Sequence, residues 1–290
     1  MSITQLIKRT PIARTLLAGP LAVRRTILRR QRQHASDIMA RFENLVTKDV
    51  QIRVDEFDGE FVIGPRSHLL HRLLVNGIYE PDLVQLFLSH IQKDRDVIDV
   101  GANVGFFTVL AAKQLGMGRV LAAEPTSAAY ARLAANIQLN NVIKNVILFN
   151  GLVSDRDGQD TVNIVPGREE YSSMGDVVHP SVAGQATQQE KIETCTLDTL
   201  VKDNNLNPAL LKVDVEGAEA LVFGGAERTL KTHKPVVISE FSPMLLEQNG
   251  SSGEAVIAMF KRCNYSVHDP HDPKAKLEHS VSGDMIALPN

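Results

Sequence analysis

The residues best placed to do chemistry begin in one short stretch, residues 96–108, which reads DVIDVGANVGFFT. Asp99 lies in a run of β-branched residues, as expected of a strand that is buried on both faces. Gly101 then allows a sharp bend and the close approach of a ligand, and Gly105 allows a strand and a helix to pack closely. The stretch therefore predicts a buried strand, a tight loop and the first turn of a helix, with a carboxylate beside the loop.

The spacing of the glycines argues against a dinucleotide. In a dinucleotide site a third glycine, in the middle of this loop, lets the pyrophosphate rest on backbone amides. Here the middle position is Asn103, and the carboxylate of Asp99 would repel a pyrophosphate at the helix N-terminus. A cationic cofactor without phosphates fits better, and S-adenosylmethionine has a sulfonium, an ammonium and a ribose diol. The loop therefore predicts S-adenosylmethionine as the cofactor.

A second carboxylate follows the next predicted strand. Residues 119–123 are mostly apolar and lead directly into Glu124. A carboxylate at the tip of the second strand of a β-α-β unit can accept hydrogen bonds from both hydroxyls of a ribose. The alternative is that Asp99 and Glu124 only cap the helices that follow them. We expect the pair to serve the cofactor, because each acid comes at the carboxyl end of a strand.

Three further acids belong to two later strands. Side chains alternate along a strand, so Lys212, Asp214 and Glu216 are expected on one side of the strand predicted over residues 209–215. Glu240 ends the next strand. Methyl transfer to an alcohol needs a group that removes the proton of the hydroxyl, and any of the three acids could serve as this base. Together they could instead hold Mg²⁺ or another hard cation that lowers the pKa of the hydroxyl, and both alternatives stay open.

The spacing of apolar residues places these acids in an α/β fold. Strands alternate with helices from residue 96 onward, and the expected strands cover residues 97–100, 119–123, 145–150, 191–196, 209–215, 235–240, 265–269 and 284–288. The last two are expected to pair as an antiparallel edge. A hairpin is expected over residues 50–64, and an irregular excursion over roughly residues 159–190 is either disordered or shapes a substrate site.

Composition limits the class of protein further. The chain has 290 residues and 43% hydrophobic residues, enough for one large core, and no apolar run long enough for a transmembrane helix. Its two cysteines, Cys195 and Cys263, argue against a disulfide framework and favour a reducing, cytoplasmic location. Aromatic residues make up 5% and Trp is absent, so no platform for stacking bases is expected and nucleic acid is not an expected partner.

The first 41 residues differ from the rest of the chain. They contain nine Lys or Arg residues and one acid, a net charge of +8, whereas the whole chain carries −3. Three alternatives are a peripheral contact with an anionic membrane, packing on the acidic core or on a second copy in a homo-oligomer, and a transit peptide. We expect a basic helical arm over residues 1–45, a hairpin and helices over residues 46–95, and a cofactor-binding domain over residues 96–290.

Several motifs occur in the order found in FkbM-type S-adenosylmethionine-dependent methyltransferases, and the chain resembles that family over roughly residues 75–289. The motifs are IYEP at 78–81, VIDVGANVG at 97–105, EP at 124–125, LDTL at 197–200 and LKVDVEGAE at 211–219. The resemblance implies a Rossmann-like sheet of seven strands, mostly parallel with one reversed, and helices on both faces. It also implies O-methylation of a hydroxyl of a sugar, a glycolipid or polysaccharide, or a natural product.

The resemblance also implies roles for residues that match its motifs. Asp99, Gly101, Asn103 and Gly105 would contact the methionine part of the cofactor, Glu124 its ribose, and Asn150 and Asp155 its adenine, while Tyr79 and Glu80 would close over it and Asp214 and Glu216 would face the acceptor. The expected partner is a hydroxylated small molecule, a glycan or a lipid-linked sugar. Two other functions are a membrane- or partner-recruited binding protein with a vestigial methyltransferase fold, and an N-methyltransferase.

Overall fold

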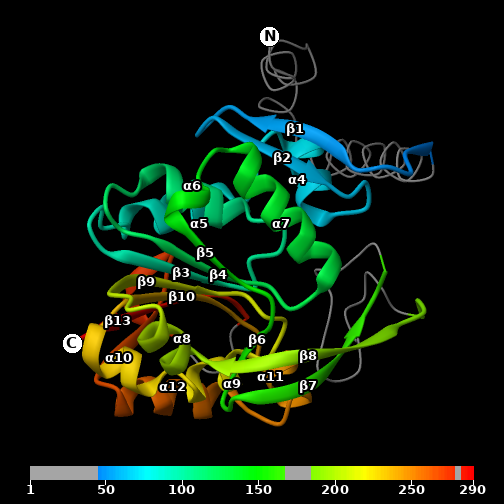
Figure 1. Ribbon diagram of the computed structural model, residues 1–290. Helices are drawn as coiled ribbons and strands as arrows, with labels where there is room; N and C mark the ends of the chain where they lie inside the picture. The colour runs from blue at the N-terminus through cyan, green and yellow to red at the C-terminus, as the bar shows by residue number, and fades with distance from the viewer. Residues whose placement is uncertain (1–44, 167–183, 278–281) are drawn as a thin grey trace, which may run out of the picture. The chain divides into compact units, whose positions relative to one another are not determined.

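The computed structural model describes residues 45–166, 184–277 and 282–290 (Figure 1). These residues form two compact units, the first of residues 45–51 and 63–81 and the second of the described residues within 52–62 and 82–290. The basic arm expected over residues 1–45 lies outside the described residues apart from Leu45, and so does the middle of the excursion expected after residue 158. The domain boundaries predicted from the sequence therefore stay predictions.

The described part of the first unit includes helix α4 and the IYEP motif. Helix α4 (His68–Asn76) ends at Gly77, whose backbone N–H donates to the Leu73 carbonyl at 2.9 Å. Tyr79 and Glu80 follow directly and are half-buried. Their closure over the cofactor stays a prediction.

The hairpin predicted over residues 50–64 is present as strands β1 (Val50–Val54) and β2 (Gly59–Ile63). Within the second unit, the rings of Phe57 and Phe61 pack against Phe106, with centroids 5.3 and 5.7 Å from that ring. Phe106 is the first residue of helix α6, so this aromatic contact holds the helix that follows the glycine loop.

A buried asparagine ties the same hairpin to the glycine loop. Asn136 of helix α7 is 0% exposed. Its Oδ1 accepts from the Val62 N–H at 2.7 Å, and its Nδ2 donates to the Val104 carbonyl at 2.8 Å. A buried amide that satisfies two backbone segments fixes their separation, so the glycine loop has a defined position before any ligand binds.

The core of the second unit is an eight-stranded sheet with the order β12-β11-β13-β10-β9-β3-β4-β5. The strands are β3 (Asp96–Val100), β4 (Val120–Ala123), β5 (Val146–Phe149), β9 (Pro208–Val213), β10 (Val236–Phe241), β11 (Tyr265–Asp269), β12 (Asp272–Lys276) and β13 (Gly283–Pro289). The five strands from β10 to β5 are parallel, and β13 runs antiparallel between β10 and β11. The implied sheet of seven strands with one reversed is thereby confirmed, with β12 as an additional edge strand.

Helices cover both faces of this sheet, so the predicted α/β fold class is confirmed. Figure 1 shows α6 and α7 on one face and α8, α10 and α12 on the other. The helices are α5 (Pro81–Ser89), α6 (Phe106–Gln114), α7 (Ser127–Leu139), α8 (Leu197–Asp203), α9 (Glu219–Gly224), α10 (Glu227–His233), α11 (Pro243–Gln248) and α12 (Gly253–Arg262), with a 3₁₀ turn η1 (Ile143–Asn145). None of the helices in the described part of the chain has the length and apolar character needed to cross a lipid bilayer.

The prediction of an irregular excursion was wrong at both of its ends. A second sheet has the order β6-β8-β7, with β6 (Leu152–Ser154), β7 (Gly158–Ile164) and β8 (Gln188–Thr196). Strands β7 and β8 pair antiparallel over their whole length, from Gly158 opposite Thr194 to Ile164 opposite Gln188. The sequence analysis missed the pairing because polar residues dominate both segments. Besides their backbone hydrogen bonds, a small apolar cluster of Leu152, Val162, Ile164 and Ile192 packs on this sheet.

Candidate cofactor and acceptor site

Four acids gather at one edge of the main sheet because their strands run in parallel. Asp99 lies in β3, Glu124 directly follows β4, Asp214 directly follows β9, and Glu240 lies near the end of β10. The carboxyl ends of parallel strands meet at a single edge, which is where open α/β sheets bind ligands. We call Asp99 and Glu124 the donor-side acids, and Asp214, Glu216 and Glu240 the acceptor-side acids.

Asp99 is the most deeply buried of these acids. It is 1% exposed, and its Oδ2 accepts from the Thr108 hydroxyl at 2.6 Å. Its Oδ1 has no hydrogen-bond partner among the described residues, although the Lys212 Nζ lies 3.8 Å away. Burial raises the pKa of Asp99, and Lys212 and the Thr108 hydroxyl oppose the rise. A buried carboxylate oxygen without a donor is suited to receive a cationic group of a ligand.

The glycine loop is shaped by the neighbouring strand as much as by any ligand. Gly101 has a φ of 76°, and a Cβ built on it would lie 1.8 Å from the Asp214 carbonyl oxygen. The Asp214 N–H also donates to the Val100 carbonyl at 3.0 Å. From the sequence, Gly101 was expected to allow a ligand to approach. In the structure, a glycine is required at this position because the Asp214 carbonyl lies so close. The loop that would bind the cofactor and the first acceptor-side acid are therefore in direct contact.

Glu124 joins the glycine loop to helix α7. Its Oε2 accepts from the Asn103 N–H at 2.9 Å, and its Oε1 accepts from the Thr126 N–H at 3.0 Å and the Thr126 hydroxyl at 2.7 Å. Asn103 has a φ of 50°, which asparagine tolerates better than most residues. Burial raises the pKa of Glu124 to about 7, and these hydrogen bonds oppose the rise. These bonds go to residues that precede α6 and α7, so the capping alternative and the ribose role both stay predictions.

The remaining residues predicted for the cofactor lie in different surroundings. Gly105 has a φ of 90° and packs against Leu133 of α7. The Nδ2 of Asn150 donates to the Glu124 carbonyl at 3.0 Å, which places Asn150 beside a donor-side acid. Asp155 lies at the surface, where its Oδ1 is 3.2 Å from the guanidinium of Arg156. The adenine roles of Asn150 and Asp155 stay predictions.

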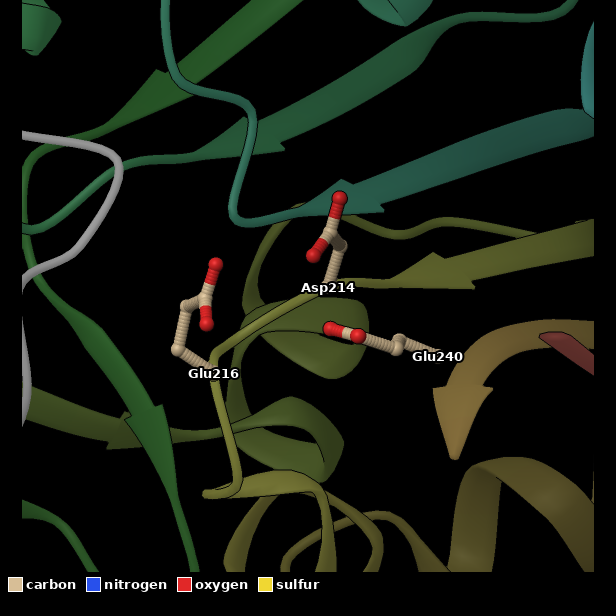
Figure 2. A group of neighbouring side chains, drawn as sticks. All are labelled: Asp214, Glu216 and Glu240. Atoms are coloured by element: carbon tan, nitrogen blue, oxygen red, sulfur yellow. The ribbon is translucent and has the colours of Figure 1, made fainter. Parts of the chain in front are cut away.

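The three acceptor-side acids converge, as Figure 2 shows. One carboxylate oxygen from each of Asp214, Glu216 and Glu240 lies within 4.8 Å of the other two, and all three residues are half-buried. The predicted convergence of the three acids is therefore present. The predicted reason was wrong for Glu216, because β9 ends at Val213 and Glu216 lies in the following turn with a φ of 51°.

Glu219 holds the turn that contains Glu216. Its Oε1 accepts from the Gly217 N–H at 3.2 Å and from the Val215 N–H at 3.4 Å, and its side chain is buried. Burial raises the pKa of Glu219 to about 7. A side chain that accepts from the residues on both sides of Glu216 fixes the direction of that turn.

Sequence reasoning missed one acid of this cluster. Asp284 of β13 is the cross-strand partner of Glu240 and is half-buried. Burial and the nearby charge of Asp214 raise its pKa, whereas His271 and Lys212 oppose the rise. The available signal was an acid at the start of the otherwise apolar run MIAL in a predicted edge strand.

The sheet order defines a Rossmann-like fold, with acids at the carboxyl edge of its parallel strands. The sequence model of the methyltransferase FkbM domain matches residues 99–267, more than half of the chain. The chain therefore belongs to the FkbM methyltransferase domain family, and the resemblance noted from its motifs is confirmed.

Known proteins of this kind match parts of the chain. It is 29% identical over 115 residues, 40% of its length, to the AMB antimetabolite synthetase AmbE of Pseudomonas aeruginosa, and 28% identical over 148 residues, 46% of its length, to Methyltransferase 1 of Beauveria bassiana. The matched regions span 5% and 59% of those two proteins. The crystal structure of an FkbM methyltransferase from Methylobacillus flagellatus shares 15% identity with a TM-score of 0.44, over 76% of this chain and 52% of that one.

Proposed function

We propose that this chain is an S-adenosylmethionine-dependent O-methyltransferase that acts on a hydroxyl of a sugar, a glycolipid or polysaccharide, or a natural product. The observation that carries the proposal is the meeting of two sets of acids at one sheet edge. The Asp214 backbone touches the glycine loop, while its carboxylate lies within 4.8 Å of those of Glu216 and Glu240. A site of this kind can hold a cationic methyl donor on one side and a proton acceptor on the other.

The residues present fit the cofactor on the donor side. Asp99 Oδ1 is buried without a hydrogen-bond donor, and Glu124 offers a carboxylate at the tip of the second strand. When bound, S-adenosylmethionine supplies a methyl group on a sulfonium. We propose that Asp99 binds the ammonium of the methionine part and that Glu124 binds the ribose hydroxyls. Both carboxylates would repel a pyrophosphate, which argues against a dinucleotide in this place.

On the acceptor side we assign the role of general base to Asp214. It is the acceptor-side acid in contact with the glycine loop, and its side chain is 41% exposed, so a hydroxyl can reach it. Asp214 would accept the proton that the hydroxyl releases, and Glu216 and Glu240 would hydrogen-bond and orient the acceptor. The alternative is a hard divalent cation held by the three carboxylates, which are the oxygen ligands such ions prefer.

The same charges indicate the class of acceptor. Four acids, with Asp284 included, make this edge negative, which disfavours an acceptor with a phosphate or carboxylate next to the reacting hydroxyl. A neutral polyol can donate hydrogen bonds to several carboxylates at once. The similarity to part of a protein named an antimetabolite synthetase supports a natural product as one form of the acceptor.

Calorimetry and labelling test the proposal. Titration of the full chain with S-adenosylmethionine and, separately, with NAD should show binding of the first only, and binding of NAD alone would end the proposal. Extracts of a strain that lacks the gene, incubated with the protein and methyl-labelled S-adenosylmethionine, should yield a labelled methyl ether by mass spectrometry. The reaction is then repeated with EDTA and with added Mg²⁺. Methyl transfer should persist in EDTA if a carboxylate is the base, and should be lost in EDTA and restored by Mg²⁺ if a bound cation is required.

We also propose a binding role for the basic residues 1–41. Their net charge of +8 supports a peripheral contact with anionic lipid from the cytoplasmic side, or packing on the acidic core of the same chain or a second copy. Sedimentation with vesicles that contain phosphatidylserine, with and without residues 1–41, tests the first of these. Equal sedimentation of the two forms would contradict a membrane role.

A further inference from the structure

Lys212 is a buried cation in the middle of the main sheet. It lies in β9, between β3 and β10, and is 4% exposed. Its neighbours in the register are Asp99 on one side and Ile238 on the other. Burial of a charged ammonium is energetically unfavourable unless negative groups compensate it. The acids that compensate Lys212 therefore indicate its role.

The partners of Lys212 lie on the two halves of the site. Its Nζ is 3.1 Å from Asp214 Oδ2, a hydrogen-bond distance, and 3.8 Å from Asp99 Oδ1. The same Nζ lies 4.9 Å above the centroid of the Phe107 ring, within the range of a cation–π contact. The ammonium therefore stands between one donor-side acid and one acceptor-side acid.

Charged groups reach this ammonium from several elements. Asp99 comes from β3 and Asp214 follows β9. Asp284 of β13 is also close enough for Lys212 to lower its pKa. Glu240 of β10 and Glu216 lie beside Asp214. Helix α6 contributes Phe107 and, through Asp99, the hydroxyl of Thr108. Several acids therefore surround one ammonium, and Lys212 reduces the electrostatic repulsion between them.

We propose that Lys212 is a positioning residue that neutralises Asp99 beneath the methyl donor and holds one carboxylate oxygen of Asp214, which leaves the other oxygen for the acceptor. The inference rests on the proposed function, because it gives Asp99 and Asp214 their roles there. Lys212 lowers the pKa that burial raises at Asp99, so without the ammonium Asp99 would hold a proton more readily and lose its attraction for a cationic ligand. Lys212 touches neither substrate in this arrangement and acts only through the two acids.

The test uses the full chain with S-adenosylmethionine as the probe, measured by calorimetry from about pH 6 to 9. The variants are Lys212→Met, Lys212→Arg and the double variant Lys212→Met with Asp99→Asn. Lys231→Met is the matched control, because Lys231 pairs with Glu227 at 2.7 Å on the exposed side of α10. The parent, the control and Lys212→Arg should share one pH dependence of affinity, which includes the contribution of Glu124, whose pKa burial raises to about 7.

For Lys212→Met we expect at least about tenfold weaker binding at the low end of this range and recovery as the pH rises, because Asp99 must then ionise to bind the donor. The double variant should bind weakly at every pH, since it lacks the titrating group. A purely structural lysine would give the same loss at every pH. An affinity of Lys212→Met that changes with pH no more steeply than that of the parent would overturn the proposal.

Thermal unfolding gives a readout that does not need the cofactor. At about pH 9, where Asp99 of Lys212→Met is forced to ionise, the double variant should unfold at a higher temperature than Lys212→Met alone, because it removes the unpaired buried carboxylate. Additive effects of the two substitutions would contradict the proposal. If Lys212→Met does not fold, recovery of folding in the double variant supports the proposal and failure of both overturns it. Lack of S-adenosylmethionine binding by the parent would instead refute the proposed function, which keeps the two failures distinct.

Discussion

The donor-side acids and the acceptor-side acids lie at the same sheet edge but differ in burial. Asp99 and Glu124 are 1% and 5% exposed, and each accepts hydrogen bonds from the surrounding protein. Asp214, Glu216 and Glu240 are half-buried. A buried, bonded carboxylate keeps a fixed geometry but is costly to ionise, whereas a half-buried one stays in exchange with water and can give and take protons. The donor side therefore suits positioning and the acceptor side suits reaction.

Loss of the proposed base should have the largest effect. Asp214→Asn is expected to lower kcat for methyl transfer by about 10³-fold, while the affinity for S-adenosylmethionine changes by less than about threefold, because the amide keeps its place but cannot accept the proton. Methyl transfer and calorimetry measure the two quantities. Asp160→Asn, which removes a surface acid that pairs with Arg156 at 2.8 Å, is the control. Unchanged turnover in Asp214→Asn would remove this residue from the mechanism.

A methyl group at Gly101 would test the contact between the two sides. Gly101→Ala places its Cβ 1.8 Å from the Asp214 carbonyl at a φ of 76°, so we expect a loss of about 3 kcal/mol in the free energy of unfolding. Gly250→Ala is a matched control, because Gly250 has a φ of 77° with no atom near its built Cβ. It should lose only about 1 kcal/mol through backbone strain. Denaturant unfolding measures both, and equal losses would show that the contact does not constrain the loop.

The buried Glu219 gives a pH-dependent test of how the acceptor side is held. Burial raises its pKa from 4.5 to about 7, so between these values the folded protein keeps a proton that the unfolded chain has released. The free energy of unfolding then falls as the pH rises through this window. Glu219→Gln should therefore gain about 2 kcal/mol relative to the parent between about pH 4.5 and 7.

Denaturant unfolding at a series of pH values measures this gain. Glu227→Gln is the control, because Glu227 is exposed and its Lys231 partner lowers its pKa, so no gain of this sign is expected. Parallel curves for the parent and Glu219→Gln would contradict the assigned ionisation.

The smallest expected effect concerns Asp99. Asp99→Asn keeps the shape of the side chain but removes its charge, and we expect about tenfold weaker binding of S-adenosylmethionine and a lower temperature of thermal unfolding, because the buried Lys212 loses one of its compensating acids. Calorimetry with sinefungin should show a similar loss, because it also has an ammonium at this place. An unchanged affinity would move the recognition of the ammonium away from Asp99.

Much of the donor side could be predicted from the sequence because its signals are local. Asp99 and Glu124 each end an apolar run, and the glycine loop follows within a few residues, so strand, turn and helix are all encoded in one short stretch. The parallel strands over residues 97–100 and 119–123 appear in the structure with shifts of only one residue at their starts. Local patterns succeed here because a strand buried on both faces has little choice of side chains.

The acceptor side and the second sheet were predicted less completely, because hydrogen bonds that the apolar pattern does not indicate fix their geometry. Glu216 owes its direction to a turn held by Glu219 and not to strand alternation. Residues 158–164 and 188–196 pair as strands although their polar composition hides it. The first depends on side-chain hydrogen bonds within one turn, and the second on pairing between two segments far apart in the chain.

By itself, the sequence determined the family, the α/β fold and the identity of the acids at the strand ends, since these follow from short patterns of residue type. Only the tertiary structure decided that Asp284 lies opposite Glu240, that Gly101 is needed because of Asp214, and that Lys212 stands between Asp99 and Asp214. The physical reason is the order of the sheet. It places β9 between β3 and β10 and brings the reversed strand β13 beside β10, so residues far apart in the chain become neighbours.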